Sequence, residues 1–197
     1  MSDLQCAARI VLARHGEAEY ESAELNDDGG SLTQRGRAQA RGLGRQLHDE
    51  RVAHVYTSSL ARAVQTGELA AGVLGVEVTV REGLHEFGVG DARGQSSGEG
   101  HFAPVVSRWL GGDPDTRVPG GESGAEIADR VAAVLDDLAD RHRGETVLVV
   151  AHGGAILATL SVLAWRRGRT DQIVNCAFAV LERDGDGWLL TTDLPTE

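Results

Sequence analysis

Apolar positions along the chain fall into short runs that alternate with longer amphipathic stretches, a pattern typical of alternating strands and helices. The short apolar or alternating runs predict strands at 10–13, 52–56, 76–80 and 146–151. Apolar residues at helical spacing predict helices over 33–49, 60–74, 123–141 and 155–165. Near the end of the chain, 176–181 and 188–192 flank Asp184-Gly185-Asp186-Gly187, which favours an antiparallel hairpin.

This alternation predicts the fold class. We expect an α/β fold: a three-layer sandwich whose mostly parallel central sheet is flanked by helices, with the C-terminal antiparallel hairpin at the sheet edge. The nearly all-apolar run 146–151 is typical of a buried central strand. A chain of 197 residues can bury a full core, so residues 1–197 are expected to form a single domain.

Local signals mark the ends of several helices. Thr33 is a candidate N-cap, the hydroxyls of Thr57-Ser58-Ser59 are suited to capping the second helix, and Ser123-x-x-Glu126 is a capping box. Two segments lack a regular pattern: the acidic stretch 18–31, typical of a solvated loop, and the Gly-rich stretch 84–121. Because a long irregular excursion in a compact domain is usually functional or mobile, 84–121 is expected to be a lid or insert over a pocket.

Composition narrows the class of partner. The net charge of −11 argues against nucleic acid or an anionic membrane as a general partner. The sequence contains no lysine, so any phosphate clamp must use arginine, histidine or backbone amides. Cys6 and Cys176 have no metal-ligand spacing, and neither a signal peptide nor an apolar run of ~20 residues is present. We therefore expect a cytoplasmic protein, while the sequence does not indicate its oligomeric state.

Three predicted strands end in residues that carry chemistry. Arg14-His15-Gly16 follows the first strand, His152-Gly153-Gly154 follows 146–151, and Arg62 comes soon after 52–56. Taken alone, the first tripeptide fits an edge strand with a surface Arg-His pair equally well. In parallel sheets, however, ligands bind beyond the carboxyl ends of the strands, so all three are expected at one crevice. A cation near a helix N-terminus, such as Arg62, also makes more sense if an anion lies beside it.

With these residues assembled, the chain resembles the histidine phosphatase superfamily, in its phosphoglycerate mutase-like branch. The matching motifs occur in family order: Arg14-His15-Gly16-Glu17, Leu32-Thr33-x-x-Gly36-x-x-Gln39-Ala40, Ser58-Ser59-x-x-Arg62-Ala63-x-Gln65-Thr66, Leu84-x-Glu86, Gly121-Glu122-Ser123 and Ala151-His152-Gly153-Gly154. No single piece is specific, but the ordered set is.

The resemblance implies a covalent mechanism through phosphohistidine, with His15 as the nucleophile. Arg14, Arg62 and His152 would hold the phosphoryl oxygens, and Glu86 would be the proton donor. Gly16, Gly153 and the amides of the helix after His152 would add substrate contacts. The resemblance implies neither a metal nor a cofactor. The substrate would be a small-molecule phosphate monoester.

One position departs from the family pattern. Many members carry a phosphate-binding Asn where this chain has Glu21, so either Asn26 replaces it or the contact is missing. Glu19 and Glu21 could together select against bisphosphorylated substrates. A zinc site from His15, His85, Glu86 and His152 is disfavoured because no pair has short metal-ligand spacing.

The sequence favours a metal-independent phosphatase and leaves two alternatives. Phosphoglycerate mutase-type transfer usually needs a longer basic insertion, whereas 84–121 contributes only Arg93, Arg108 and Arg117. A phosphate-binding signalling module without turnover is the second alternative. A dinucleotide-binding oxidoreductase is excluded because no Gly-x-Gly-x-x-Gly follows the first strand. The physiological substrate is not indicated, and the expected rim residues are Arg93, His101, Arg108, Trp109 and Arg117.

Overall fold

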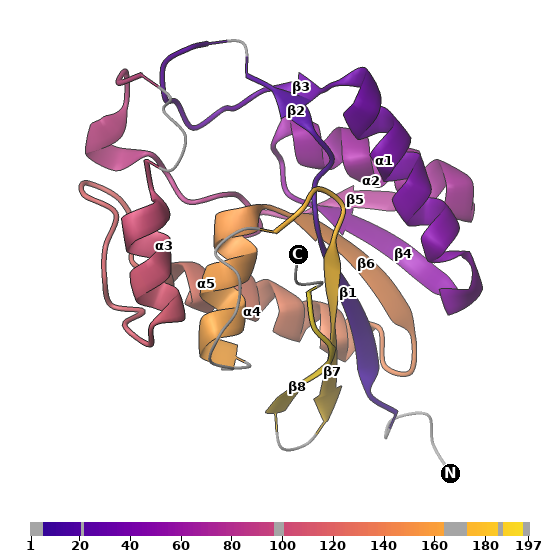
Figure 1. Cartoon of the computed structure of the whole chain (residues 1–197). Helices are drawn as coiled ribbons and strands as arrows, with labels where there is room; N and C mark the ends of the chain where they lie inside the picture. The colour runs from indigo at the N-terminus through magenta and orange to yellow at the C-terminus, as the bar shows by residue number, and fades with distance from the viewer. Residues whose placement is uncertain (1–5, 21, 97–100, 164–172, 185–186, 195–197) are drawn as a thin grey trace.

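The central sheet of the computed structural model contains four parallel strands followed by an antiparallel pair (Figure 1). Its order is β5-β4-β6-β1-β7-β8. The bounds are β1 (Ala8–Arg14), β4 (Val52–Thr57), β5 (Val78–Val80), β6 (Thr146–Ala151), β7 (Phe178–Asp184) and β8 (Gly187–Thr192). The structure describes residues 6–20, 22–96, 101–163, 173–184 and 187–194. The predicted α/β class and the antiparallel edge hairpin are confirmed, while Gly185 and Asp186 of its turn lie outside the described residues.

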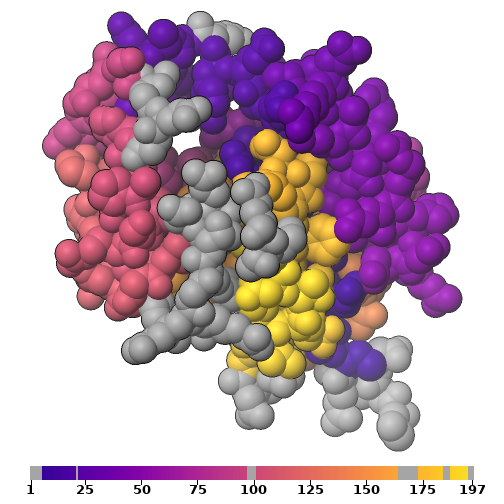
Figure 2. Space-filling model, in the orientation of Figure 1, coloured from indigo at the N-terminus to yellow at the C-terminus, as the bar shows by residue number. Residues whose placement is uncertain are grey.

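Helices cover both faces of this sheet. Figure 1 shows α1 (Gln34–Gln46) and α2 (Ala61–Leu74) on one side, and α4 (Gly124–Arg141) and α5 (Gly153–Leu163) on the other, with α3 (Ala103–Leu110) packed beside α5. In the space-filling view the purple surface around α1 and the pink surface around α3 accordingly lie on opposite sides (Figure 2).

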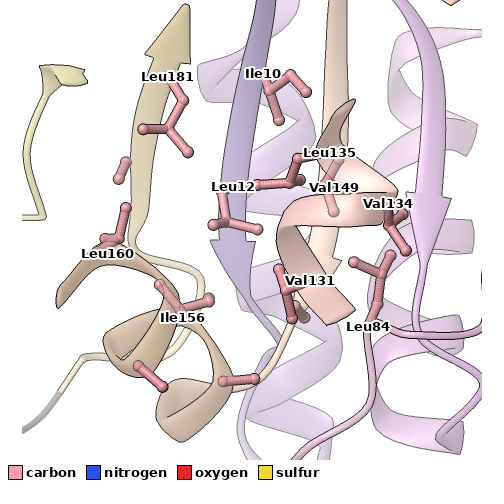
Figure 3. Packing of buried hydrophobic residues seen from close by; sticks show 14 of the residues in the cluster. Ile10, Leu12, Leu84, Val131, Val134, Leu135, Val149, Ile156, Leu160 and Leu181 are labelled. Atoms are coloured by element: carbon pink, nitrogen blue, oxygen red, sulfur yellow. The ribbon is translucent and has the colours of Figure 1, made fainter. Parts of the chain in front are cut away.

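Alternation along β1 places its side chains in two separate cores. Val11 and Ala13 pack with residues of α1 and α2, whereas Ile10 and Leu12 pack with residues of α4 and α5. Figure 3 shows Ile10 and Leu12 beside the α4 and α5 side chains. A strand buried on both faces is rigid, which fixes the position of whatever follows its carboxyl end.

The helix-end signals were right at two helices and wrong at a third. Thr33 accepts a bond from the Gly36 amide (2.9 Å), and Ser123 and Glu126 form both bonds of a capping box. α2 instead begins after Leu60, without a side-chain cap, so the predicted hydroxyl cap is wrong. Ser58 Oγ accepts from the Leu60 amide and also bonds His152. The second bond could not be predicted from the position of Ser58 in the sequence.

The two irregular segments contain short regular pieces. The acidic stretch 18–31 is not loop throughout, because β2 (Ala18–Glu19) pairs with β3 (Ser31–Leu32). Gly30 permits this pairing, since a Cβ there would lie 1.4 Å from the Glu19 carbonyl oxygen. The stretch 84–121 holds η3 (Gly90–Ala92) and α3, and it is tied to the acidic stretch where Asp27 Oδ1 accepts from the Val89 amide (2.8 Å). Another short helix, η2 (His48–Glu50), follows α1, which ends three residues earlier than predicted.

Candidate active site

His15 follows β1 directly and is held by the neighbouring strand. Its amide donates to the Ala151 carbonyl oxygen (3.0 Å), which extends the β1–β6 ladder by one bond. Its Nδ1 lies 2.7 Å from the Gly16 carbonyl oxygen. A carbonyl oxygen can only accept, so Nδ1 carries the ring proton and Nε2 is left with a lone pair. His15 is 4% exposed, which leaves Nε2 as the reactive edge of a buried ring.

Arg62 reaches that lone pair from the first turn of α2. Its Nε donates to His15 Nε2 (3.1 Å), and its Nη1 donates to the Asp28 carbonyl oxygen (3.2 Å). Gly29, at φ +67°, leaves room for the guanidinium, because a Cβ there would lie 1.8 Å from Nη1. Arg14 lines the same cavity, and its Nε is buried without a hydrogen-bond partner in the described part of the chain. Two guanidinium groups therefore converge on His15.

The surroundings of His15 keep its imidazole neutral. Burial, together with the charges of Arg62 and Arg14, lowers its pKa from 6.5 to about 3, although the bond to Gly16 opposes this shift. A neutral ring with its lone pair on Nε2 is the form required of a nucleophile, once Arg62 gives up its bond to that atom. The two cations that depress this pKa also provide a place for an anion.

His152 lies beside His15, at the end of β6. The ring centroids are 5.1 Å apart, and His152 is 0% exposed. Its Nε2 lies 2.7 Å from Ser58 Oγ, which already accepts from the Leu60 amide. This contact holds the His152 ring through Nε2, on the side away from Nδ1.

His152 Nδ1 is buried and has no hydrogen-bond partner among the described residues. Burial lowers the pKa of His152 well below its usual value, with Arg62 and His15 adding to the shift. The ring does not itself line the cavity that His15 faces.

Glu86 lies across this cavity, at the N-terminus of α5. Its Oε2 accepts from the Gly154 amide (3.0 Å), and its Oε1 accepts from the amides of Ala155 (2.8 Å) and Phe87 (3.1 Å). Gly154 allows this approach, since a Cβ there would lie 2.9 Å from Glu86 Oε1. The expectation that the first amides of this helix bind phosphate is therefore wrong for Gly154 and Ala155, because both donate to Glu86.

The cavity between these groups measures about 320 Å³. It is lined by Arg14, His15, Tyr20, Arg62, Glu86, Phe87, Val106, Gly153, Gly154, Leu157 and Ile173. Five of these side chains were not identified from the sequence: Tyr20, Phe87, Val106, Leu157 and Ile173. Tyr20 lies with its ring centroid 5.8 Å from the Arg62 guanidinium carbon. The four apolar side chains gave no motif signal, because isolated apolar residues in a sequence are indistinguishable from core.

Other residues expected near the site have different roles. Asn26 bonds within its own loop, to the Gly29 amide and the Glu24 carbonyl oxygen, and does not line the cavity. Glu21 lies outside the described residues. Gly16 packs against α1, where a Cβ would lie 2.6 Å from the Gly36 carbonyl oxygen, and its amide donates to Thr66 Oγ1 (3.0 Å).

The expected rim residues do not line this cavity. The three arginines are paired with carboxylates: Arg93 with Asp27, Arg108 with Asp113 and Arg117 with Glu126. Trp109 is fully buried and donates to the Thr116 carbonyl oxygen, and His101 is exposed elsewhere.

Two kinds of feature are absent from the described ranges. No three or more His, Cys, Asp or Glu side chains there are arranged to hold a metal ion. No helix within those ranges is long and apolar enough to cross a membrane.

Comparison with known sequences identifies the family. Residues 10–193 match the histidine phosphatase superfamily (branch 1), and the chain belongs to this family. Among similar sequences, a probable phosphoglycerate mutase GpmB of Photorhabdus laumondii is 30% identical over 188 residues, covering 92% of this chain and 87% of that protein. Phosphoglycerate mutase-like protein 4 of Arabidopsis thaliana is 32% identical over 192 residues, covering 93% and 83%.

Solved structures agree with this assignment. Bacillus stearothermophilus YhfR has a TM-score of 0.79 at 25% identity, covering 96% of this chain and 98% of that one. A mycobacterial glucosyl-3-phosphoglycerate phosphatase has a TM-score of 0.75 at 25% identity, covering 96% and 100%. The resemblance inferred from the ordered motifs is thus confirmed, and the related proteins include both mutases and phosphatases by name.

Proposed function

We propose that this protein is a metal-independent phosphatase that hydrolyses small phosphate monoesters through a phosphohistidine intermediate. The observation that carries the proposal is the state of His15: Nδ1 is bonded to the Gly16 carbonyl oxygen, and the Nε2 lone pair accepts from Arg62 in a cavity that Arg14 also lines. A neutral imidazole fixed in this tautomer can attack phosphorus, and the adjacent guanidinium groups can hold the transferring oxygens.

In the first step, Arg62 Nε releases the lone pair of His15 and donates to a phosphoryl oxygen. Nε2 then attacks phosphorus in line, and the bond from phosphorus to the ester oxygen breaks. Glu86, in its protonated form, donates its proton to the departing alcohol. Arg14 and Arg62 compensate charge on the equatorial oxygens. His152 adjoins His15 without lining the cavity, so its contact with a phosphoryl oxygen requires a movement of its ring.

In the second step, water attacks the phosphorus of phosphohistidine. The Glu86 carboxylate takes a proton from this water, the N–P bond breaks, and inorganic phosphate leaves. Glu86 is protonated again and His15 is neutral again, so the cycle closes without a metal or cofactor.

Hydrolysis is favoured over mutase transfer by the charges around the cavity. A mutase must also hold a second phosphate-bearing group of its substrate, which calls for cations away from the nucleophile. The arginines among the described lining residues are Arg14 and Arg62, and the charges of both act on His15. The names of the GpmB relatives favour phosphoglycerate mutase activity as the second candidate.

The test is hydrolysis of p-nitrophenyl phosphate by wild type and by His15→Ala. We expect turnover by the wild type and a loss of about 10⁴-fold or more in kcat for the variant, as for removal of other catalytic nucleophiles. The control is His48→Ala, which alters an exposed histidine in η2.

Acid-labile, alkali-stable phosphate on wild type after rapid quenching, absent from His15→Ala, would identify the intermediate. Equal activity of the two proteins would refute the assignment. Binding of phosphate esters without turnover would support the silent module, and phosphoglycerate interconversion exceeding hydrolysis would support the mutase.

A further inference from the structure

Glu86 reaches α5 from a segment that contains neither helix nor strand. It lies in residues 81–89, between β5 and η3, and its carboxylate accepts from the amides of Gly154 and Ala155. Because such a segment has no regular ladder of backbone bonds to fix its course, side chains and packing must do so. The position of the proposed proton donor therefore depends on what holds the main chain beside it.

Arg130, in the second turn of α4, binds the main chain immediately before Glu86. Its Nη1 donates to the carbonyl oxygens of Gly83 (2.9 Å) and His85 (2.8 Å). Hydrogen bonds from a charged donor are stronger than those between neutral groups. One guanidinium nitrogen thus fixes two carbonyl groups within three residues of Glu86.

Glu122 in turn fixes the Arg130 side chain. Arg130 Nε donates to Glu122 Oε1 (2.7 Å) and Nη2 donates to Glu122 Oε2 (3.0 Å), and the two side chains are 17% and 29% exposed. Two parallel bonds set the plane of a guanidinium as well as its position. The Gly121-Glu122-Ser123 motif thus supplies the N-cap of α4 and, one residue earlier, the partner of Arg130.

Close packing of the segment on α4 supports the same arrangement. Gly83 has φ +90°, and a Cβ there would lie 2.8 Å from Val134 Cγ2. The next residue, Leu84, is fully buried, and Figure 3 shows its side chain near those of Val131 and Val134. Because α4 also packs against α5, the main chain beside Glu86 is fixed to one helix and its carboxylate to the neighbouring one.

We propose that Arg130, held by Glu122, positions Glu86 for proton transfer, a role that rests on the phosphatase function proposed above. Arg130 is not among the described residues that line the His15 cavity, so it acts on the reaction through Glu86. Glu86 and Glu122 also line a neighbouring acidic cavity of about 610 Å³, together with Glu82. A carboxylate between two cavities has room to move, and a displacement of about 1 Å from the reacting atoms can cost about 10² in rate.

The test compares two esters that differ in their need for a proton donor. Benzyl alcohol must be protonated as it departs, whereas p-nitrophenolate departs without a proton. Arg130→Met keeps an unbranched apolar side chain but removes the donors, so kcat/KM for benzyl phosphate should fall by about 10- to 100-fold. For p-nitrophenyl phosphate it should stay within about threefold of wild type, because kcat/KM reports the attack by His15 and not the later hydrolysis of phosphohistidine. An unchanged value for benzyl phosphate, or equal losses for both esters, would overturn the proposal.

Arg141→Met is the matched control. Arg141 is on the same helix and pairs with Asp137, so its replacement removes an ion pair of α4 without touching the segment that carries Glu86. Both kcat/KM values should remain at the wild-type level. If Arg130→Met does not fold, Arg130→Lys decides the question by the same contrast. Lysine keeps the charge but cannot form the bidentate pair, so a loss of about three- to tenfold confined to benzyl phosphate is expected.

Glu122→Gln tests the pair itself. The amide keeps the shape of the side chain but loses the charge and one accepting oxygen, so kcat/KM for benzyl phosphate should fall by about three- to tenfold. Because Glu122 acts through Arg130, the same substitution should cause no further loss in an Arg130→Met background. Additive losses would show that Glu122 acts independently and would contradict the pairing.

An NMR measurement separates this proposal from the function on which it rests. The amide resonances of Gly154 and Ala155 report the bonds to the Glu86 carboxylate, whatever the activity. They should shift in Arg130→Met as they do in Glu86→Gln. No turnover of any ester would refute the phosphatase function, while shifted resonances would still assign the positioning of Glu86 to Arg130. Turnover that depends on His15, with unmoved resonances in Arg130→Met, would refute the positioning role alone.

Discussion

Two helix N-termini lie beside the cavity, and they carry side chains of opposite charge. The N-terminus of α5 holds a carboxylate, with both oxygens of Glu86 accepting amide bonds from Gly154 and Ala155. The N-terminus of α2 has no acidic residue in its first turn and instead carries Arg62, buried and bonded to His15. The positive end of one helix is therefore compensated, whereas that of the other is reinforced by a cation.

This difference supports the proposed place of the phosphoryl group. A helix N-terminus favours negative charge by about 0.3–1 kcal/mol when exposed, and by more when partly buried. At α5 this preference is already satisfied by Glu86. At α2 the positive end of the helix dipole adds to the charges of Arg14 and Arg62, so the positive potential is highest around His15. Under the proposed mechanism, the N-terminus of α2 stabilises the phosphoryl dianion, and the N-terminus of α5 positions Glu86 as the proposed proton donor.

The largest effect on turnover is expected from replacing Glu86, the carboxylate at the N-terminus of α5. Glu86→Gln removes the proton donor and replaces one of the two accepting oxygens with an amide donor. Turnover of a poor leaving group such as benzyl phosphate should fall by about 10²–10⁴-fold, the range for general acid catalysis. The defect should be much smaller for p-nitrophenyl phosphate, because its leaving group departs without a proton. Steady-state kcat for the two esters measures the contrast.

Glu82→Gln is the control for that change, since Glu82 lines the neighbouring acidic cavity and not the one at His15. Glu82→Gln should leave both turnover numbers near the wild-type values. Losses of equal size for the two esters in Glu86→Gln would mean that Glu86 organises the helix end and does not deliver a proton.

An effect of intermediate size is expected in the pH at which His15, beside the N-terminus of α2, becomes protonated. Its pKa is lowered to about 3, mainly by burial and then by Arg62 and Arg14, so the neutral form should persist as the pH falls through 5. A histidine with the ordinary pKa of about 6.5 would be only ~3% neutral at pH 5, a difference of about thirtyfold in the nucleophilic form. Imidazole ¹⁵N shifts from NMR between pH 8 and pH 4.5 would report the ring directly. Protonation of His15 near pH 6.5 would show that burial and the two arginines do not lower its pKa.

How much of this site was predictable from sequence depends on where each residue lies. His15 and His152 follow buried parallel strands directly, and strands of this kind fix both the place and the direction of the next residue. Arg62 was suspected because a cation is out of place at a helix N-terminus. For Glu86, by contrast, only the family resemblance gave a reason, since the bonds that hold it come from amides about seventy positions later.

The errors have a physical origin as well. A sequence shows which groups can form a hydrogen bond, but not which partner each one takes. Ser58 was expected to cap α2 and instead bonds His152 as well as the Leu60 amide, and the α5 amides expected at phosphate donate to Glu86. The apolar lining residues of the cavity were missed because Phe87, Val106, Leu157 and Ile173 come together only through the tertiary fold.

The smallest expected effect concerns the aromatic ring over Arg62. Tyr20 is 59% exposed and presents its ring to the Arg62 guanidinium at 5.8 Å. A cation–π contact at an exposed site is worth roughly 0.5–1 kcal/mol, so Tyr20→Ala should lower kcat/KM by about two- to fivefold. Tyr20→Phe keeps the ring and should retain the wild-type value in p-nitrophenyl phosphate assays. If Phe and Ala reduced kcat/KM equally, the hydroxyl and not the ring face would be responsible. If neither substitution changed kcat/KM, Tyr20 would not help to position Arg62. The bonds of Arg62 to His15 and to the Asp28 carbonyl oxygen would then be sufficient.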